Sequence, residues 1–250
     1  MNREAASPAS DGRSTVVADD PAVVTVWSDI GCPWAALALH VLRGRAAATG
    51  TTLLVDHRAF PLELFNRRPT PKPVIDMEVV AIAGLVPEVG WRLWREPDSA
   101  YAVTTLPAMA AVQAAKDPRV GGFRAADELD AALRTAFYRD HRCISVHAEI
   151  LAAAETCPSV DVPALERELA RGAGHAEVFR QFRTAQGPRV QGSPHLFVGH
   201  RYAAHNPGVE YHWTGRPGQG FPRFERYDRA WADHVLGLVA SAPQRPNEPS

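Results

Sequence analysis

The chain has 250 residues, of which 46% are hydrophobic and 22% charged, values that are ordinary for a globular protein. They exclude a wholly disordered chain, a collagen and a coiled-coil rod. The formal net charge of -1 provides no global field that would attract nucleic acid or an anionic membrane surface. No stretch of the sequence reaches the about 20 consecutive apolar residues that span a bilayer. We therefore expect neither nucleic acid nor a membrane among its partners.

Both ends of the chain are poor in apolar side chains. Residues 1–20 are rich in Ser, Ala and Asp, and residues 242–250 in Pro and polar side chains, so we predict a disordered leader and tail. The leader lacks the apolar run of a signal peptide. The cysteines, Cys32, Cys143 and Cys157, form no CxxC pair and no zinc-ribbon spacing. These features predict a reduced, cytoplasmic protein.

After the leader, the chain opens with a strand, a helix and a second strand. Residues 23–27 are β-branched and aromatic, which is typical of a buried strand. Pro33 begins an Ala/Leu-rich segment over residues 34–48, and proline favours the first position of a helix. Residues 52–60 predict the second strand. The segment between these two strands, which includes the helix, is long enough for a right-handed crossover that connects parallel strands.

Between residues 62 and 186 the hydrophobic period changes from that of strands to that of helices, and strand signals are almost absent. We predict an inserted, all-helical subdomain over 62–186. The segments that suit helices are 74–86, 88–95, 106–115, 123–139, 146–156 and 162–183.

Strand character returns at residues 195–198, and residues 201–203 suit the return strand of a hairpin. Residues 206–224 are rich in Gly and Pro, which predicts a long loop, and residues 226–240 suit a closing helix. This order of elements predicts an α/β protein. Its small mixed sheet is flanked by helices and interrupted by the helical insertion.

Cys32 stands where the first strand ends and the first helix begins. Unpaired backbone N–H groups and the helix dipole stabilise an anion at that position. Cysteines so placed can have pKa values lowered to ~3.5–7.5, and a thiolate is a nucleophile. The alternative is a small buried hydrophobic residue, as many free cysteines are. We expect Cys32 to be the catalytic nucleophile, with a pKa below the ~8.5 of a free cysteine.

Three segments resemble the DsbA-like branch of the thioredoxin superfamily. Residues 28–35, S-D-I-G-C-P-W-A, are similar to its active-site stretch, S-D-x-x-C-P-W-C in cytosolic members. Residues 190–198, V-Q-G-S-P-H-L-F-V, resemble its V-x-G-x-P-x-x-x-V segment, whose proline is cis and opens the third strand. Residues 137–145 resemble a helical-insertion segment. The branch includes 2-hydroxychromene-2-carboxylate isomerases, kappa-class glutathione transferases and mycothiol-dependent reductases.

This resemblance implies a thioredoxin-like fold, with its main domain formed by residues 21–61 and 187–241 around the insertion. It also implies that no cofactor is bound permanently and that a low-molecular-weight thiol, glutathione or mycothiol, serves as co-substrate. A small-molecule thiol or disulfide would be the substrate. Whether the chain forms a homodimer stays open.

The resemblance also implies a set of substrate-binding residues around the nucleophile. Pro194 would lie against Cys32, and the backbone of Ser193 would pair with a bound thiol or peptide. Pro33 and Trp34 would complete the groove. We expect the Trp34 ring to be partly exposed, where it either covers the groove or simply packs beside it.

The chain departs from the family at residue 35, where Ala35 replaces the second active-site cysteine. A dithiol enzyme resolves its mixed disulfide with that second thiolate, so Cys32 would depend on an external thiol. Three functions stay open: a monothiol oxidoreductase, which we favour; a thiol-dependent isomerase or transferase of the 2-hydroxychromene-2-carboxylate isomerase type; and a binding protein that has lost catalysis.

Two other groups of residues carry weaker signals. His200, His205 and His212, with Asp228 further on, lack the spacings of zinc sites, so we expect no metal. The aromatic residues within 91–101 suit either the core of the insertion or the wall of a hydrophobic substrate cleft.

Overall fold

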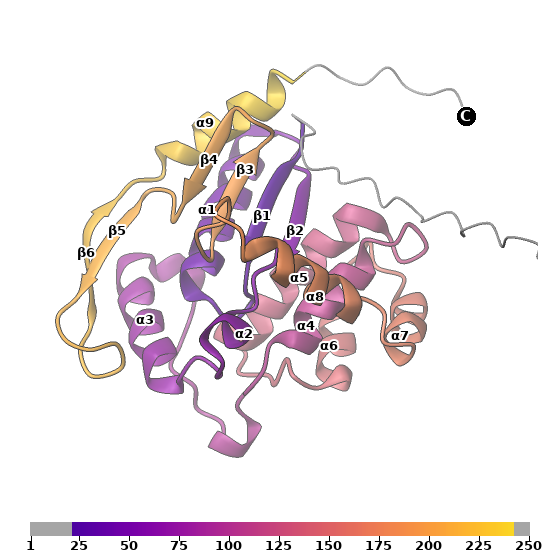
Figure 1. Cartoon of the computed structure of the whole chain (residues 1–250), viewed down its shortest axis with the longest axis horizontal. Coiled ribbons are helices and arrows are strands. Elements are labelled where there is room, and N and C mark those ends of the chain that lie inside the picture. The colour runs from indigo at the N-terminus through magenta and orange to yellow at the C-terminus, as the bar shows by residue number, and fades with distance from the viewer. Residues whose placement is uncertain (1–21, 243–250) are drawn as a thin grey trace, which may run out of the picture.

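The computed structural model describes residues 22–242. The predicted leader over residues 1–20 and nearly all of the predicted tail over 242–250 lie outside these residues. Figure 1 shows a sheet with helices on both sides and a large helical block beside it. Within residues 22–242, no helix is both long and apolar enough to cross a membrane.

The opening strand–helix–strand unit forms as the sequence predicts. Strand β1 (Val24–Ser28) is buried along its whole length and pairs in parallel with β2 (Val55–Ala59). Helix α1 (Pro33–Thr49) connects the two strands, with Cys32 at its N-cap and a proline in its first turn. The helix ends at Gly50, whose φ of 64° is a left-handed conformation that glycine adopts without steric cost.

The residues between β2 and the next strand form helices, most of which pack around one core together with Ile30, Ala36 and Ala59 of the opening unit. In α5, for example, the apolar side chains recur at helical spacing and are buried. Within the described part of this block there is no strand. The helices are α2 (Leu62–Asn66), α3 (Lys72–Leu85), α4 (Leu106–Ala115), α5 (Gly122–Tyr138), α6 (His147–Ala154), α7 (Val162–Ala170) and α8 (His175–Ala185), with short 3-10 turns η1 (Pro87–Val89) and η2 (Asp98–Ala100).

Two helical predictions in this block are wrong. Residues 91–95 form neither helix nor strand, because Gly90 takes a left-handed φ of 67° and ends the preceding turn. The predicted helix over 162–183 is two helices, α7 and α8. Gly174, with a φ of 85°, approaches the backbone of Ala110 so closely that a Cβ atom there would collide with its carbonyl.

The remaining strands complete a mixed sheet of order β2-β1-β3-β4. Strand β3 (His195–Val198) runs antiparallel to β1, and β4 (Tyr202–His205) pairs antiparallel with β3. Leu196 and Val198 pack in the core with α1 and with α9 (Ala230–Ala240), while Phe197 packs in a cluster on the opposite face. The predicted mixed sheet is confirmed.

The predicted loop over residues 206–224 is wrong. It contains a second, two-stranded sheet of β5 (Val209–Trp213) and β6 (Pro222–Tyr227), and α9 consequently begins at Ala230 rather than at residue 226. Side chains in β5 alternate between half-buried and exposed, whereas most of the glycines lie in the turn that joins the strands. Figure 1 shows this hairpin beside α3, and β6 contacts that helix.

Candidate active site

The structure brings Cys32 and the segment around Pro194 together, although they are far apart in the sequence. The Cys32 Sγ–H donates to the backbone oxygen of Ser193 at 3.2 Å. The Ser193–Pro194 peptide bond is cis. The backbone N–H of Asp29 donates to Ser193 Oγ at 3.0 Å, which ties the turn before Cys32 to the same residue. Pro33 is buried as the first residue of α1.

Trp34 is buried, with 5% of its surface exposed, so the expectation of a partly exposed ring is wrong. Its ring stacks on Tyr211 at a centroid distance of 3.9 Å and meets Phe224 edge-on at 5.6 Å. Its Nε1–H donates to Glu78 Oε1 at 2.9 Å. Both aromatic partners come from the β5–β6 hairpin, which covers the Trp34 ring. The sequence did not indicate this cover, because it predicted a loop in place of the hairpin.

The thiol of Cys32 is not activated in this structure, contrary to the expectation of a lowered pKa. Cys32 is 4% exposed, and burial, together with the smaller effect of the nearby negative Glu78 carboxylate, raises its pKa to about 12. Exclusion of water penalises the thiolate more than the N-terminus of α1 stabilises it. The resting form of Cys32 is therefore the protonated thiol.

Glu78 is a member of the site that sequence reasoning missed. It lies on α3, is 8% exposed, and burial raises its pKa to about 7, against a smaller opposite effect of the Trp34 hydrogen bond. A signal was present in the sequence. Glu78 lies at helical spacing with Ile75, Val79 and Ile82, which form the buried stripe of α3. An acidic residue in such a stripe indicates a buried carboxyl.

Helix α5 holds the turn that precedes Cys32. Arg134 donates through Nη1 to the carbonyl oxygens of Asp29 at 3.1 Å and Ile30 at 3.3 Å, and through Nη2 to Ser28 Oγ at 3.0 Å. Tyr138 lies one helical turn later, and its hydroxyl donates to Ile30 O at 3.1 Å. The helical block therefore fixes the backbone that leads into the candidate nucleophile. No local sequence motif predicts this role for Arg134 and Tyr138.

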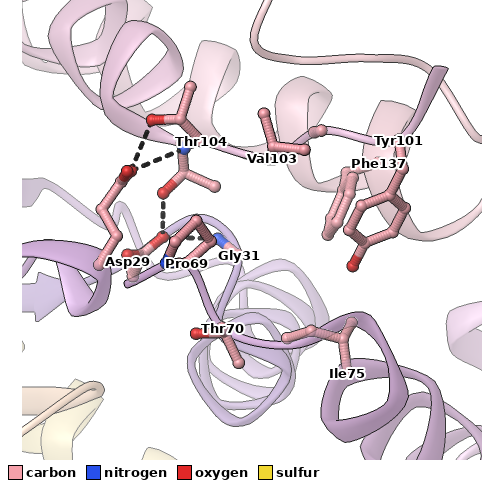
Figure 2. A pocket seen from close by; sticks show the side chains of 12 residues that line it. Asp29, Gly31, Pro69, Thr70, Ile75, Tyr101, Val103, Thr104 and Phe137 are labelled. Carbon is pink, nitrogen blue, oxygen red and sulfur yellow. Dashed lines mark hydrogen bonds between the residues drawn. The ribbon is translucent and has the colours of Figure 1, made fainter. Parts of the chain in front are cut away.

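A pocket lies between this turn and the helical block, and Figure 2 shows its polar and aromatic ends. At the polar end, the carboxylate of Asp29 accepts from the Thr105 hydroxyl at 2.7 Å and from the backbone N–H of Gly31 at 2.8 Å. Burial raises the pKa of Asp29 above its usual range. The rings of Tyr101 and Phe137 form the other end.

The remaining sequence candidates do not join this site. Within residues 22–242, no group of three or more His, Cys, Asp or Glu side chains is arranged to hold a metal ion. His212 pairs with Glu225 on the β5–β6 hairpin. Cys157 is buried and Cys143 partly buried, and neither is in a disulfide.

The sequence matches no protein-family model and no curated protein. Among solved structures, the chain is similar to the cytosolic disulfide reductase DsbM from Pseudomonas aeruginosa, at a TM-score of 0.57 and 15% identity over 88% of this chain and 97% of that chain. The structure of the same reductase with GSH matches at a TM-score of 0.56 and 15% identity, over 88% of this chain and 98% of that chain. A probable DsbA oxidoreductase from Streptomyces coelicolor matches at a TM-score of 0.58 and 16% identity, over 89% of this chain and 92% of that chain. At these identities the likeness concerns the fold, and the chain therefore has the DsbA-like thioredoxin fold that its motifs predict.

Proposed function

We propose that this protein is a thiol oxidoreductase in which Cys32 is the single nucleophilic thiol. The observation that carries the proposal is the position of Cys32 Sγ. It lies at the N-terminus of α1, 3.2 Å from the carbonyl oxygen of Ser193, the residue that precedes the cis Pro194. The similarity of the fold to that of disulfide reductases supports this assignment.

The proposed reaction is a thiol–disulfide exchange in two steps. Cys32 loses its proton to solvent, and the thiolate attacks a disulfide RSSR, forming a Cys32–S–S–R bond and releasing RS⁻. Ala35 is fully buried and supplies no second thiol. An external thiolate R′S⁻ then attacks the mixed disulfide, regenerates the Cys32 thiolate and leaves as RSSR′. Each cycle consumes one disulfide and one thiol and yields one of each.

The external thiol in this proposal is a small one, glutathione or mycothiol, and no permanently bound cofactor takes part. The glutathione-containing structure of the similar reductase supports a small thiol as co-substrate. A cytoplasmic location is part of the proposal, since a reducing compartment supplies such thiols. Trp34, Pro33 and the backbone of Ser193 would contact the bound thiol.

The test is the formation of a mixed disulfide with oxidised glutathione, followed by intact-mass measurement. One persistent glutathione adduct is expected in the wild-type protein, in Cys143→Ser and in Cys157→Ser, and none in Cys32→Ser. Ala35→Cys places a second sulfur one helical turn from the first, so its adduct should resolve into an internal disulfide, whereas Ala35→Ser should keep it. An adduct that persists in Cys32→Ser contradicts the proposal.

A thiol-dependent isomerase or transferase of the 2-hydroxychromene-2-carboxylate isomerase type is the second candidate, which the family resemblance leaves open. The pocket in Figure 2 borders Gly31, next to Cys32, and combines aromatic rings with polar groups. Its free volume of about 30 Å³ is far below the ~300–1,000 Å³ of ligand pockets, so an aromatic substrate would have to widen it. Turnover of chromene-type or electrophilic aromatic compounds with glutathione, without net disulfide exchange, would select this function. Failure of Cys32 to form an adduct under any condition would instead select the non-catalytic binding protein.

A further inference from the structure

A second cavity, of about 540 Å³, lies between the sheet and helices α4 and α8, and this volume is within the range of small-molecule sites. Trp27 of β1 and Asp56 and Arg58 of β2 line it. They lie on the face of the sheet opposite α1, since Val24 and Val26 of β1 pack in the core with that helix. The residues that line the cavity include none of the candidate active site.

Two cationic side chains that line this cavity share one carboxylate. Asp56 is 4% exposed, and it accepts from Arg58 Nε through Oδ2 at 2.8 Å and from Lys116 Nζ through Oδ1 at 2.6 Å. The Lys116 ammonium also donates to the carbonyl oxygen of His57. Burial lowers the pKa of Lys116, and the Asp56 carboxylate opposes this effect. With Lys116 protonated, the group of Asp56, Arg58 and Lys116 carries one positive charge in excess.

The other carboxylates that line the cavity have cationic partners of their own. These ion pairs are Asp117–Arg119, Glu168–Arg171 and Glu177–Arg180. Glu177 is close enough to Lys116 to favour its ammonium form, but the charge of Glu177 is already paired with an arginine. No carboxylate that lines the described cavity is therefore left to balance the charge beside Asp56.

Arg58 also has N–H groups that no described protein group accepts. Its Nε donates to Asp56, whereas Nη1 and Nη2 have no hydrogen-bond partner among residues 22–242. These two atoms are open to solvent, although the side chain as a whole is only 16% exposed. The guanidinium carbon lies 5.6 Å from the centroid of the Trp27 ring, and Trp27 is the register partner of Arg58. The guanidinium thus offers a planar pair of donors beside an aromatic side chain.

We propose that this cavity binds a small molecule that carries a carboxylate on an aromatic body. The carboxylate accepts two parallel hydrogen bonds from Nη1 and Nη2 of Arg58 and balances the charge beside Asp56. The aromatic body packs against the rings of Phe123 and Trp27, which both line the cavity. The cavity shares no residue with the candidate active site, so either assignment can fail without the other.

The test follows the indole N–H signal of Trp27 in the full chain by NMR, with benzoate as the probe. Benzamide has the same ring without the charge, and acetate has the charge without the ring. Benzoate is expected to shift the signal saturably at millimolar concentrations, and both analogues should bind about tenfold more weakly or less. No saturable response to benzoate overturns the proposal. Benzamide that binds as tightly as benzoate would exclude the carboxylate contact, and acetate that does so would exclude the aromatic contact.

Removal of the guanidinium locates the carboxylate. Arg58→Gln should weaken the binding of benzoate about tenfold or more, because it removes the charged pair of donors. The matched control is Arg124→Gln on α5, whose side chain is 81% exposed and does not line the cavity. This control should bind benzoate as the wild type does. Equal affinity in the two variants would show that benzoate binds elsewhere.

A second variant fills the cavity without changing its ion pairs, and it decides the question if Arg58→Gln does not fold. Thr184 is an exposed residue of α8 that lines the cavity, so Thr184→Trp should weaken the binding of benzoate about tenfold or more. Arg183→Trp, at the exposed neighbouring position that does not line the cavity, is the control and should leave the affinity unchanged. Wild-type affinity for benzoate in Thr184→Trp overturns the proposal.

Discussion

A buried carboxyl group near α1 disfavours the charged form of Cys32. Glu78 and Cys32 are both buried, and the exclusion of water raises the pKa of both groups. The negative charge of Glu78 raises the pKa of the Cys32 thiol as well. The Glu78 carboxyl has a hydrogen bond from Trp34 but no salt bridge among the described residues. Its ionisation in the folded protein therefore costs free energy.

This cost makes the stability of the protein depend on pH in a predictable direction. The pKa of Glu78 rises from 4.5 to about 7 on folding. The folded state therefore binds more protons than the unfolded state between these values, and stability falls as pH rises through that range. The shift corresponds to about 3 kcal/mol, present at pH 4.5 and lost above pH 7. Glu78→Gln should abolish this component.

Urea unfolding of the wild type and of Glu78→Gln at acidic and at slightly alkaline pH measures the effect. The wild type should lose more unfolding free energy between the two pH values than the variant, because all other ionisable groups are common to both. Identical pH dependence in the two proteins would mean that Glu78 ionises as freely as in the unfolded chain.

At the scale of elements, the β5–β6 hairpin decides how accessible the candidate nucleophile is. Tyr211 of β5 stacks on Trp34, and Phe224 of β6 contacts the same ring. Together with α3, this hairpin excludes water from the N-terminal turn of α1. Since burial is the largest cause of the raised pKa of Cys32, the hairpin acts on the thiol through solvent exclusion.

Removal of the Tyr211 ring should therefore accelerate alkylation of Cys32. In Tyr211→Ala, water reaches the thiol and its pKa falls. Each unit of decrease gives about tenfold more thiolate at neutral pH, since the wild-type pKa lies far above neutrality. The measurement is the rate of iodoacetamide labelling, resolved by peptide mass. Glu210→Ala, on the exposed side of the same strand, is the control and should label at the wild-type rate. Equal labelling rates in the two variants would show that the Tyr211 ring does not limit the reactivity of Cys32.

At the scale of the whole molecule, a buried ionic network joins the helical block to the sheet. Asp130 of α5 accepts from Arg134 at 3.0 Å and from Arg43 of α1 at 2.8 Å. These guanidinium groups hold the pKa of Asp130 well below its usual range, although burial opposes the shift. Arg134 also binds the carbonyl oxygen of Ile30 in the turn before Cys32. The network thus couples global stability to the geometry of the candidate site.

Loss of Arg134 should be strongly destabilising, because it leaves Asp130 and two backbone oxygens without this donor in the interior. Arg134→Leu is expected to lower the free energy of unfolding by about 3–5 kcal/mol. Urea denaturation at neutral pH measures the change. Arg124→Leu, an exposed arginine on the same helix, should change stability by no more than about 0.5 kcal/mol. Comparable losses of unfolding free energy in the two variants would show that the network does not contribute to stability.

Much of the fold was predictable because its signals are local. The apolar run before Cys32, the proline at the start of α1 and the helical period of α4 and α5 each lie within one element. The β5–β6 hairpin was not predictable. Its short alternating strands lie beside a turn so rich in Gly and Pro that the whole segment suits a loop. The contact between Cys32 and Ser193 joins residues 161 positions apart, and only the family resemblance indicated it.

The sequence by itself determined where Cys32 lies, at a junction of strand and helix, and that Ala35 offers no second thiol. Both follow from neighbours in the chain. Only the tertiary structure decided that the thiol is protonated, since its pKa depends on the water excluded by β5 and β6 and on the charge of Glu78 in α3. Packing between distant elements sets these quantities, and packing leaves no local pattern at residue 32.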